Sequence, residues 1–141
     1  MSVNDGDKDN LLQIARDMKS MGFKLLATAG TQRHLKENGI EADSILKAGE
    51  GRPNVVDLIK SRKIDLIINT PLGSKSFHDE KSIRRAATQY RVACITTLSA
   101  ARAAVNAIHT LQHEKLTVRS IQEYHGTEKI KSSLPDATFT F

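Results

Sequence analysis

One stretch of this 141-residue chain, residues 64–69 with the sequence Ile-Asp-Leu-Ile-Ile-Asn, limits the possible fold more than any other. A short and nearly continuous apolar run is typical of a parallel β-strand that helices cover on both faces. Other segments with strand character occur at residues 1–3, 23–27, 43–46 and 92–95. Segments with helical spacing of apolar residues separate these strands. The alternation predicts an α/β domain with a five-stranded parallel sheet and right-handed crossovers.

The predicted helices begin and end at residues that commonly cap helices. The candidate N-caps carry short side chains with an oxygen acceptor: Asp7 or Asp9 for a helix that begins near Lys8, and Ser99 for an alanine-rich helix that runs to about Gln112. The candidate stop signals are glycines that directly follow a helical segment: Gly22 and Gly39. Three more helices are expected at residues 32–38, from residue 55 onward, and at about residues 79–90.

The length of the chain predicts one domain, at residues 1–125, which is large enough to bury a core. Within its last part, residues 117–121 have the composition of a short additional strand. Residues 126–141 have a mixed polar composition, and we expect a loosely held tail there.

Composition excludes several classes of protein. No apolar run approaches the roughly 20 residues of a membrane span, and no export signal precedes the first strand, so a cytoplasmic protein is expected. A single cysteine, Cys94, excludes an internal disulfide and a cysteine-based metal cluster, and its apolar surroundings predict a place in the core. The net charge is +5, but the basic residues are dispersed and Trp is absent, so a nucleic-acid partner is not expected. An anionic small ligand fits this charge better.

The loops that follow the strands are the best candidates for a ligand site. In a parallel sheet these loops meet at the carboxyl edge, where ligands bind. The loop at residues 28–31, Thr-Ala-Gly-Thr, joins a strand to a helix, and a glycine turn with unpaired helix N–H groups suits an anion. The same residues also suit a simple turn and helix cap. The loops at the same edge also bring cationic side chains, Lys8, Lys47, Arg52 and Lys75, together with Asn69. This convergence predicts a phosphate or carboxylate site.

Residues for catalysis are harder to find at this edge. The carboxylates there are not arranged in pairs: Asp5, Asp7, Glu50, Asp79 and Glu80. His109 and His113 have the i, i+4 spacing of metal ligands, but without a third ligand nearby a solvated pair is expected. Neither a Gly-x-Ser-x-Gly elbow nor a lysine placed as in a phosphate-binding Walker loop occurs. The residues therefore favour binding over catalysis.

Five motifs together resemble a known family. They are Thr-Ala-Gly-Thr at 28–31, Lys47 with Glu-Gly-Arg-Pro at 50–53, Ile-Ile-Asn-Thr at 67–70, Ile-Arg-Arg-Ala at 83–86 with Tyr90, and Thr-Thr-Leu at 96–98. In order and spacing, over about residues 2–125, they are similar to the methylglyoxal-synthase-like domain at the C-terminal end of the carbamoyl-phosphate synthase large chain. The resemblance implies a three-layer α/β/α fold with strand order 3-2-1-4-5. It also implies a regulatory domain that is not itself catalytic.

The resemblance implies partners and ligands as well. The effector would be a nucleotide such as UMP or IMP, or else ornithine or N-acetylglutamate. Formation of carbamoyl phosphate, for pyrimidine and arginine synthesis, would take place in other domains of the parent enzyme, which would hold ATP, Mg and K. Those synthetase domains, and other copies of this domain, would be its protein partners, and a cofactor in this domain, a nucleic acid and a membrane would not be involved.

By the same resemblance, site residues carry over position by position. The effector's phosphate would contact residues on three loops: Lys8, Thr28, Gly30, Thr31 and Lys47. Asn69 and Thr70 would lie along the nucleotide, and Thr96 near an ornithine joint. Pro71 departs from the nucleotide-responsive pattern, which has a threonine there, and proline lacks both the hydroxyl and the N–H.

Two alternatives remain open. The sister family, methylglyoxal synthase, acts on dihydroxyacetone phosphate and has an aspartate base in the loop after its third strand, where this chain has Arg52 or Pro53. A standalone phosphate-binding module is the other alternative.

Overall fold

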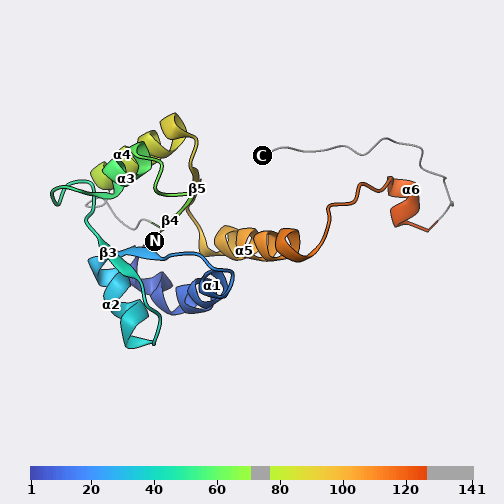
Figure 1. Ribbon diagram of the computed structural model, residues 1–141, viewed down its shortest axis with the longest axis horizontal. Coiled ribbons are helices and arrows are strands. Elements are labelled where there is room, and N and C mark those ends of the chain that lie inside the picture. Colours follow the sequence, from blue (N-terminus) through green and yellow to red (C-terminus); the bar gives the residue numbers. More distant parts are fainter. Residues whose placement is uncertain (71–76, 127–141) are drawn as a thin grey trace.

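The computed structural model describes residues 1–70 and 77–126 and is an α/β structure with parallel strands (Figure 1). The strands are β1 (Ser2–Val3), β2 (Leu26–Thr28), β3 (Asp43–Ile45), β4 (Leu66–Thr70) and β5 (Ala93–Ile95). The helices are the 3₁₀ turn η1 (Asp5–Asp7), α1 (Lys8–Ser20), α2 (Ala29–Glu37), α3 (Val55–Lys60), α4 (Phe77–Tyr90), α5 (Leu98–His113) and α6 (Ile121–Tyr124). The predicted fold class is therefore confirmed.

The strands form two parallel ladders. One has the order β1-β4-β5 and the other pairs β2 with β3. Met1 links the ladders, because its amino group donates to the carbonyl of Leu26 and its carbonyl accepts from the amide of Thr28 at 3.1 Å. β1 thus begins between β2 and β4. A single sheet with the order 3-2-1-4-5 stays a prediction, because β1 and β2 do not pair as a regular ladder over the described residues.

Strand β4 divides the core into two clusters. Ile68 packs in one cluster with buried side chains of α1, α2, β2 and α5, such as Leu11 and Val105. Its neighbour Ile67 faces the other side and packs in a second cluster with α3 and α4, which includes Ile83. Adjacent strand residues point to opposite faces, so β4 is buried on both. This explains why its sequence is an apolar run without alternation. In Figure 1, α3 and α4 accordingly lie on one side of the strands and α1 and α2 on the other.

The predicted helix stops are confirmed, and the predicted N-caps are not. Gly22 and Gly39 follow α1 and α2 with φ of +90° and +73°, a conformation that glycine adopts without steric cost. Asp7 occupies the N-cap position of α1 but makes no side-chain cap bond, because its carboxylate accepts from the Asn4 side chain at 2.7 Å. Ser99 lies inside the first turn of α5, and Thr97 is the cap, accepting from the amide of Ala100 at 3.3 Å.

The region after α5 differs from the prediction. Residues 117–121 do not form a strand; residues 115–120 are irregular and exposed, and α6 follows. Ser120 and Glu123 form a reciprocal capping box, which favours a helix turn over an extended segment. Cys94 is half-buried against the second cluster, and burial raises the pKa of its thiol. Most of the predicted tail, residues 127–141, lies outside the described residues, as do Lys75 and Pro71.

Candidate functional site: the N-terminus of helix α2

The Thr-Ala-Gly-Thr motif forms the start of α2. Thr28 ends β2 and is the N-cap residue, with extended φ and ψ of −66° and 153°. Ala29, Gly30 and Thr31 already lie in the helix, so α2 begins three residues earlier than its apolar spacing indicated. The Thr28 hydroxyl donates to the Ser2 hydroxyl at 3.3 Å and does not cap the helix. Thr28 therefore does not provide a side-chain acceptor for the first N–H groups of α2, and such a helix start suits an incoming anion.

Lys8 lies over this first turn. A Cβ atom built on Gly30 would be 3.4 Å from Lys8 Nζ, so the ammonium group is close to the helix backbone. A cation is unfavourable at the positive end of a helix dipole. Here Asp5 offsets it, with its carboxylate Oδ1 2.6 Å from Lys8 Nζ. An anion bound between Lys8 and the N–H groups of α2 would interact favourably with both.

Lys47 belongs to the same edge of the molecule. The hydrogen bond and charge of Lys8 lower the pKa of the Asp5 carboxyl, and the charge of Lys47 lowers it further. Lys47 is exposed in the loop after β3, and its backbone N–H donates to the carboxylate of Glu50 at 3.0 Å. The positive charges of Lys8 and Lys47 thus both act on the carboxylate beside the α2 N-terminus.

Thr31 lies at the site, but its hydroxyl makes a contact within the fold, whereas the resemblance implied a contact to phosphate. It is 2% exposed, and its hydroxyl oxygen accepts from the backbone N–H of Val3 at 3.2 Å. The hydroxyl therefore ties α2 to β1. A hydroxyl that accepts one bond still has its own proton to donate, so this contact does not prevent a further one.

Asn69 and Thr70 lie at the end of β4, where both are buried. The Thr70 hydroxyl accepts from the backbone N–H of Asn4 at 3.3 Å and from the Asn4 side chain at 3.2 Å. Asn4 was not identified as a site residue from the sequence. It joins the exit of β1 to β4 and also binds Asp7. An asparagine directly after a strand and three residues before an aspartate is a local signal that could have pointed to it.

Thr96 is not part of this group. It is exposed directly after β5, and in the order β1-β4-β5 that strand is separated from β1 by β4.

Arg52 forms an ion pair with Asp57, with Nε 3.9 Å from Oδ1. A hollow of about 380 Å³ lies beside this loop, lined by residues of the loop and of α3, among them Gly51 and Asn54.

The carboxylates of the loop after β3 take part in local hydrogen bonds. Glu50 accepts from the N–H of Lys47, and Asp57 accepts from the N–H of Asn54 at 3.1 Å. His109 and His113 are exposed and stacked, with ring centroids 4.3 Å apart, as expected for a solvated pair. Across residues 1–70 and 77–126, groups of three or more potential metal ligands do not occur. Nor does this part of the chain contain a helix long and apolar enough to cross a membrane.

Comparison with known proteins identifies a family and several relatives. Residues 10–96 match the MGS-like domain family. The chain is 52% identical over 126 residues to the carbamoyl phosphate synthase large chain of Archaeoglobus fulgidus, covering 89% of this chain and 12% of the relative. It is 48% identical over 126 residues to the C-terminal section of that large chain from Methanopyrus kandleri, covering 89% of this chain and 23% of the relative. The chain thus spans a small part of these relatives.

A solved structure supports the fold. Methylglyoxal synthase from Elizabethkingia anophelis aligns with a TM-score of 0.61 at 18% identity, covering 96% of this chain and 91% of that one. Identity this low shows a shared fold alone. Together with the family match over more than half of the chain, it leads to one assignment: this chain belongs to the MGS-like domain family and is similar to part of carbamoyl phosphate synthase large chains.

Proposed function

We propose that this domain is the regulatory part of a carbamoyl phosphate synthase large chain and binds a phosphorylated effector at the N-terminus of α2. The observation that carries the proposal is the position of Lys8 Nζ over Gly30, at a helix start without a side-chain cap. A phosphate group there would accept hydrogen bonds from helix N–H groups and pair with Lys8, while Lys47 would neutralise a second charge. ATP, Mg, K and the synthesis of carbamoyl phosphate would belong to other domains of the parent enzyme.

We also propose that this domain is not itself catalytic. Abstraction of a proton from dihydroxyacetone phosphate needs a free carboxylate beside the phosphate site. Asp5, the carboxylate that lies there, is paired with Lys8, and this pairing lowers its pKa, which makes it a weaker base. A nucleotide base or ribose would extend from the phosphate site towards Asn69 and Thr70 at the end of β4.

Calorimetric titration tests the proposed function. UMP, IMP, ornithine, N-acetylglutamate and inorganic phosphate are titrated separately into the protein. We expect a phosphorylated nucleotide to bind, and Lys8→Ala and Lys47→Ala each to weaken its binding about tenfold or more, since charge-assisted hydrogen bonds contribute about 1.5–3 kcal/mol. Lys19→Ala is the matched control, because Lys19 lies at the other end of α1 and pairs with Glu41 at 3.0 Å.

The alternative functions predict different results, in this titration or in an assay for methylglyoxal. Binding of inorganic phosphate with no preference for a nucleotide would indicate a standalone phosphate-binding module. Formation of methylglyoxal from dihydroxyacetone phosphate would show an enzyme and contradict the proposal. If ornithine binds, Thr96→Ala is expected to weaken ornithine and leave the nucleotide unaffected. No heat with any of these ligands at millimolar concentration would refute effector binding.

A further inference from the structure

Helices α1, α2, α3 and α4 all end in the same hydrogen-bonded motif. In each, a residue just past the helix donates its N–H to the carbonyl three residues before it, and the next residue donates to the carbonyl five residues before it. This is the Schellman motif, and the first of the two residues takes a left-handed conformation that glycine adopts most easily. In α1 and α2 that residue is a glycine, Gly22 and Gly39.

The helices α3 and α4 have arginine at this position instead. Arg62 and Arg91 have φ of +54° and +57°. For a residue with a Cβ atom this conformation is unfavourable, and it is retained where the surrounding structure or a function maintains it. Both side chains are exposed, and across residues 1–70 and 77–126 neither takes part in an ion pair. Contacts within the described fold therefore do not explain the two arginines.

The two arginines lie at the same edge of the sheet. Arg62 precedes β4 and Arg91 precedes β5, and these strands pair in parallel with Leu66 opposite Ala93. The helices themselves pack together on one side of β4, in the second core cluster (Figure 1). The ends of α3 and α4 therefore meet at the amino ends of the strands, opposite the carboxyl edge at which the proposed effector site lies.

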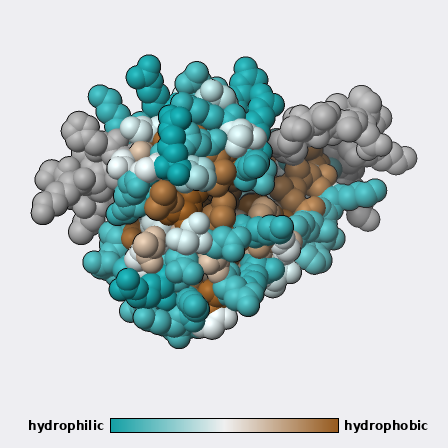
Figure 2. Space-filling view, turned by 60° about the vertical axis from the view of Figure 1, so that its left-hand side comes forward, coloured by the Kyte–Doolittle hydropathy of each residue, from teal (hydrophilic) through white to brown (hydrophobic). Residues whose placement is uncertain are grey.

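Other exposed cations lie on the same two helices and the residues that follow them. Two carboxylates there, Asp57 and Glu80, already pair with Arg52 and Arg84. Figure 2 shows hydrophilic side chains over the upper part of the molecule, where α3 and α4 lie, and apolar surface gathered in a hollow below them. We call the exposed cationic surface the α3–α4 face, and it consists of Lys60, Arg62, Lys63, Arg85 and Arg91.

The surroundings of the α3–α4 face distinguish between classes of anionic partner. Basic surfaces that bind membranes also carry apolar side chains that enter the lipid. In the described chain the exposed large apolar side chains lie elsewhere, at Leu46 in the loop after β3 and from Leu111 onward. Single-stranded nucleic acid is bound by stacking on exposed aromatic rings, but Tyr90 is half-buried against the second core cluster. Carboxylates of a protein need neither feature, and the planar guanidinium group matches their geometry.

We propose that the α3–α4 face is a docking surface for an acidic segment of a partner protein, whose carboxylates pair with Arg62 and Arg91 across the amino ends of β4 and β5. The charges of the two sides are complementary, and the partner's carboxylates would supply the interaction that the two arginines lack within the described fold. A different explanation is that the arginines stabilise the negative ends of the helix dipoles. The two explanations predict opposite effects of glycine on stability. The proposal does not depend on an effector at α2.

Binding of a fluorescently labelled glutamate decapeptide tests the proposal. Fluorescence anisotropy is measured at low salt, where exposed charges are least screened. The double variant Arg62→Gly/Arg91→Gly removes both guanidinium groups and supplies the residue that the helix ends favour. The double variant Arg16→Gln/Arg102→Gln is the matched control, because it removes the same charge from exposed positions of α1 and α5, which pack on the other side of β4. Thermal unfolding is measured for all three proteins.

We expect the glycine variant to bind the peptide about fivefold more weakly or worse, and the control to stay within about twofold of the unsubstituted protein. The glycine variant should also melt about 1–4 °C higher, because the unfavourable backbone conformation is relieved.

Three results would overturn the proposal. Equal weakening in both variants would mean that only net charge matters. A lower melting temperature of the glycine variant would mean that the arginines serve the helix ends. Tighter binding of a thymidine deoxynucleotide decamer or of anionic vesicles than of the peptide, lost in the glycine variant, would assign the face to a nucleic acid or a membrane.

Discussion

At the scale of single residues, the site combines groups that bind a ligand with groups that hold the binding groups in place. Lys8 is available to an anion because, within residues 1–70 and 77–126, its ion pair is with a surface carboxylate, Asp5. Thr31 is already bonded to the backbone of β1. The family resemblance implied that both would be phosphate contacts. Their different roles become visible only when the neighbours of each side chain are known.

Thr31 provides a test of this difference. Thr31→Val keeps the shape of the side chain but leaves the buried N–H of Val3 without its acceptor, so a loss of about 1–3 kcal/mol of unfolding free energy is expected. Thr31→Ser keeps the hydroxyl and should lose less. Urea denaturation of the two variants measures the difference. Equal losses would show that the hydrogen bond contributes little.

A substitution at Gly30 should affect ligand binding but not the stability of the fold. Its Cβ would lie 3.4 Å from the mobile end of Lys8, which can move, and alanine favours a helix over glycine by up to about 1 kcal/mol. Gly30→Ala is therefore expected to leave the melting temperature unchanged or slightly higher. The same methyl group would occupy the approach of an anion to the α2 N–H groups, so calorimetry should show weaker effector binding. Unchanged affinity would place the ligand elsewhere.

At the scale of elements, short helices depend on their caps. α3 has only six residues, and Asn54 accepts at its start from the amides of Val56 and Asp57 at 3.0 and 3.3 Å. The Asn54 amide also donates to the carbonyl of Gly51 at 2.7 Å. One buried side chain thus holds both the helix and the loop that leads into it. The sequence predicted this helix from its apolar residues, but the capping box was not anticipated.

Asn54→Ala removes both functions of this side chain, and a loss of about 1–3 kcal/mol in unfolding free energy is expected. Asn54→Asp keeps the cap acceptor and loses the bonds from the side-chain amide to the carbonyls of Gly51 and Ala48, so it should be intermediate. Chemical denaturation ranks the three proteins. If Asn54→Asp were as unstable as Asn54→Ala, the loop contact rather than the cap would be the main contribution.

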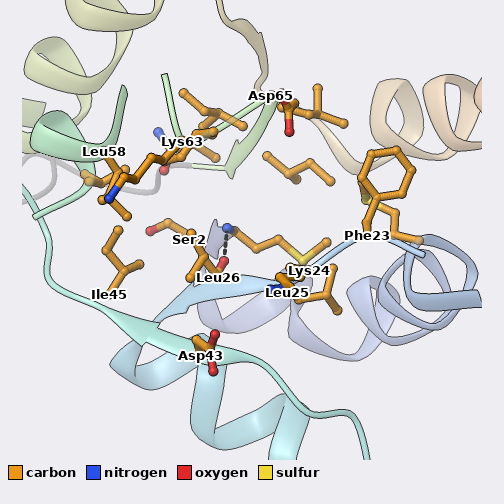
Figure 3. A pocket seen from close by; sticks show the side chains of 18 of the residues that line it. Ser2, Phe23, Lys24, Leu25, Leu26, Asp43, Ile45, Leu58, Lys63 and Asp65 are labelled. Carbon is orange, nitrogen blue, oxygen red and sulfur yellow. Dashed lines mark hydrogen bonds between the residues drawn. The ribbon is translucent and has the colours of Figure 1, made fainter. Parts of the chain in front are cut away.

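At the scale of the whole molecule, two half-cores meet along β4 and around a cavity. The carboxyl ends of the strands are joined by bonds from Met1, Val3 and Asn4 to α2, β2 and β4, so the proposed effector site lies where the halves are tied together. The other ends of β2 and β4 face a cavity of about 530 Å³ (Figure 3).

When the protein is produced as residues 1–141, the buried amino group of Met1 predicts a pH dependence. Its pKa is 8.0 when unfolded and about 6 in the native state, so between these values the unfolded chain binds more protons. Stability should then rise by about 2–3 kcal/mol from pH 6 to pH 8 and level off above. The charged side chains at the cavity are Lys24, Asp43, Lys63 and Asp65. Thermal unfolding of the N-acetylated chain is the control, and an equal rise there would assign the effect to other groups.

The sequence by itself determined the fold class, the alternation of strands and helices, and the convergence of Lys8, Lys47 and residues 28–31 at one edge. Each of these follows from periodicity, or from the rule that parallel strands end at one edge. Tertiary structure decided which hydroxyls are already bonded, that Thr97 rather than Ser99 caps α5, and that residues 117–120 are irregular where a strand was predicted. It also decided that a cavity lies between β2 and β4. These outcomes depend on distances between residues far apart in the chain, which local sequence pattern does not specify.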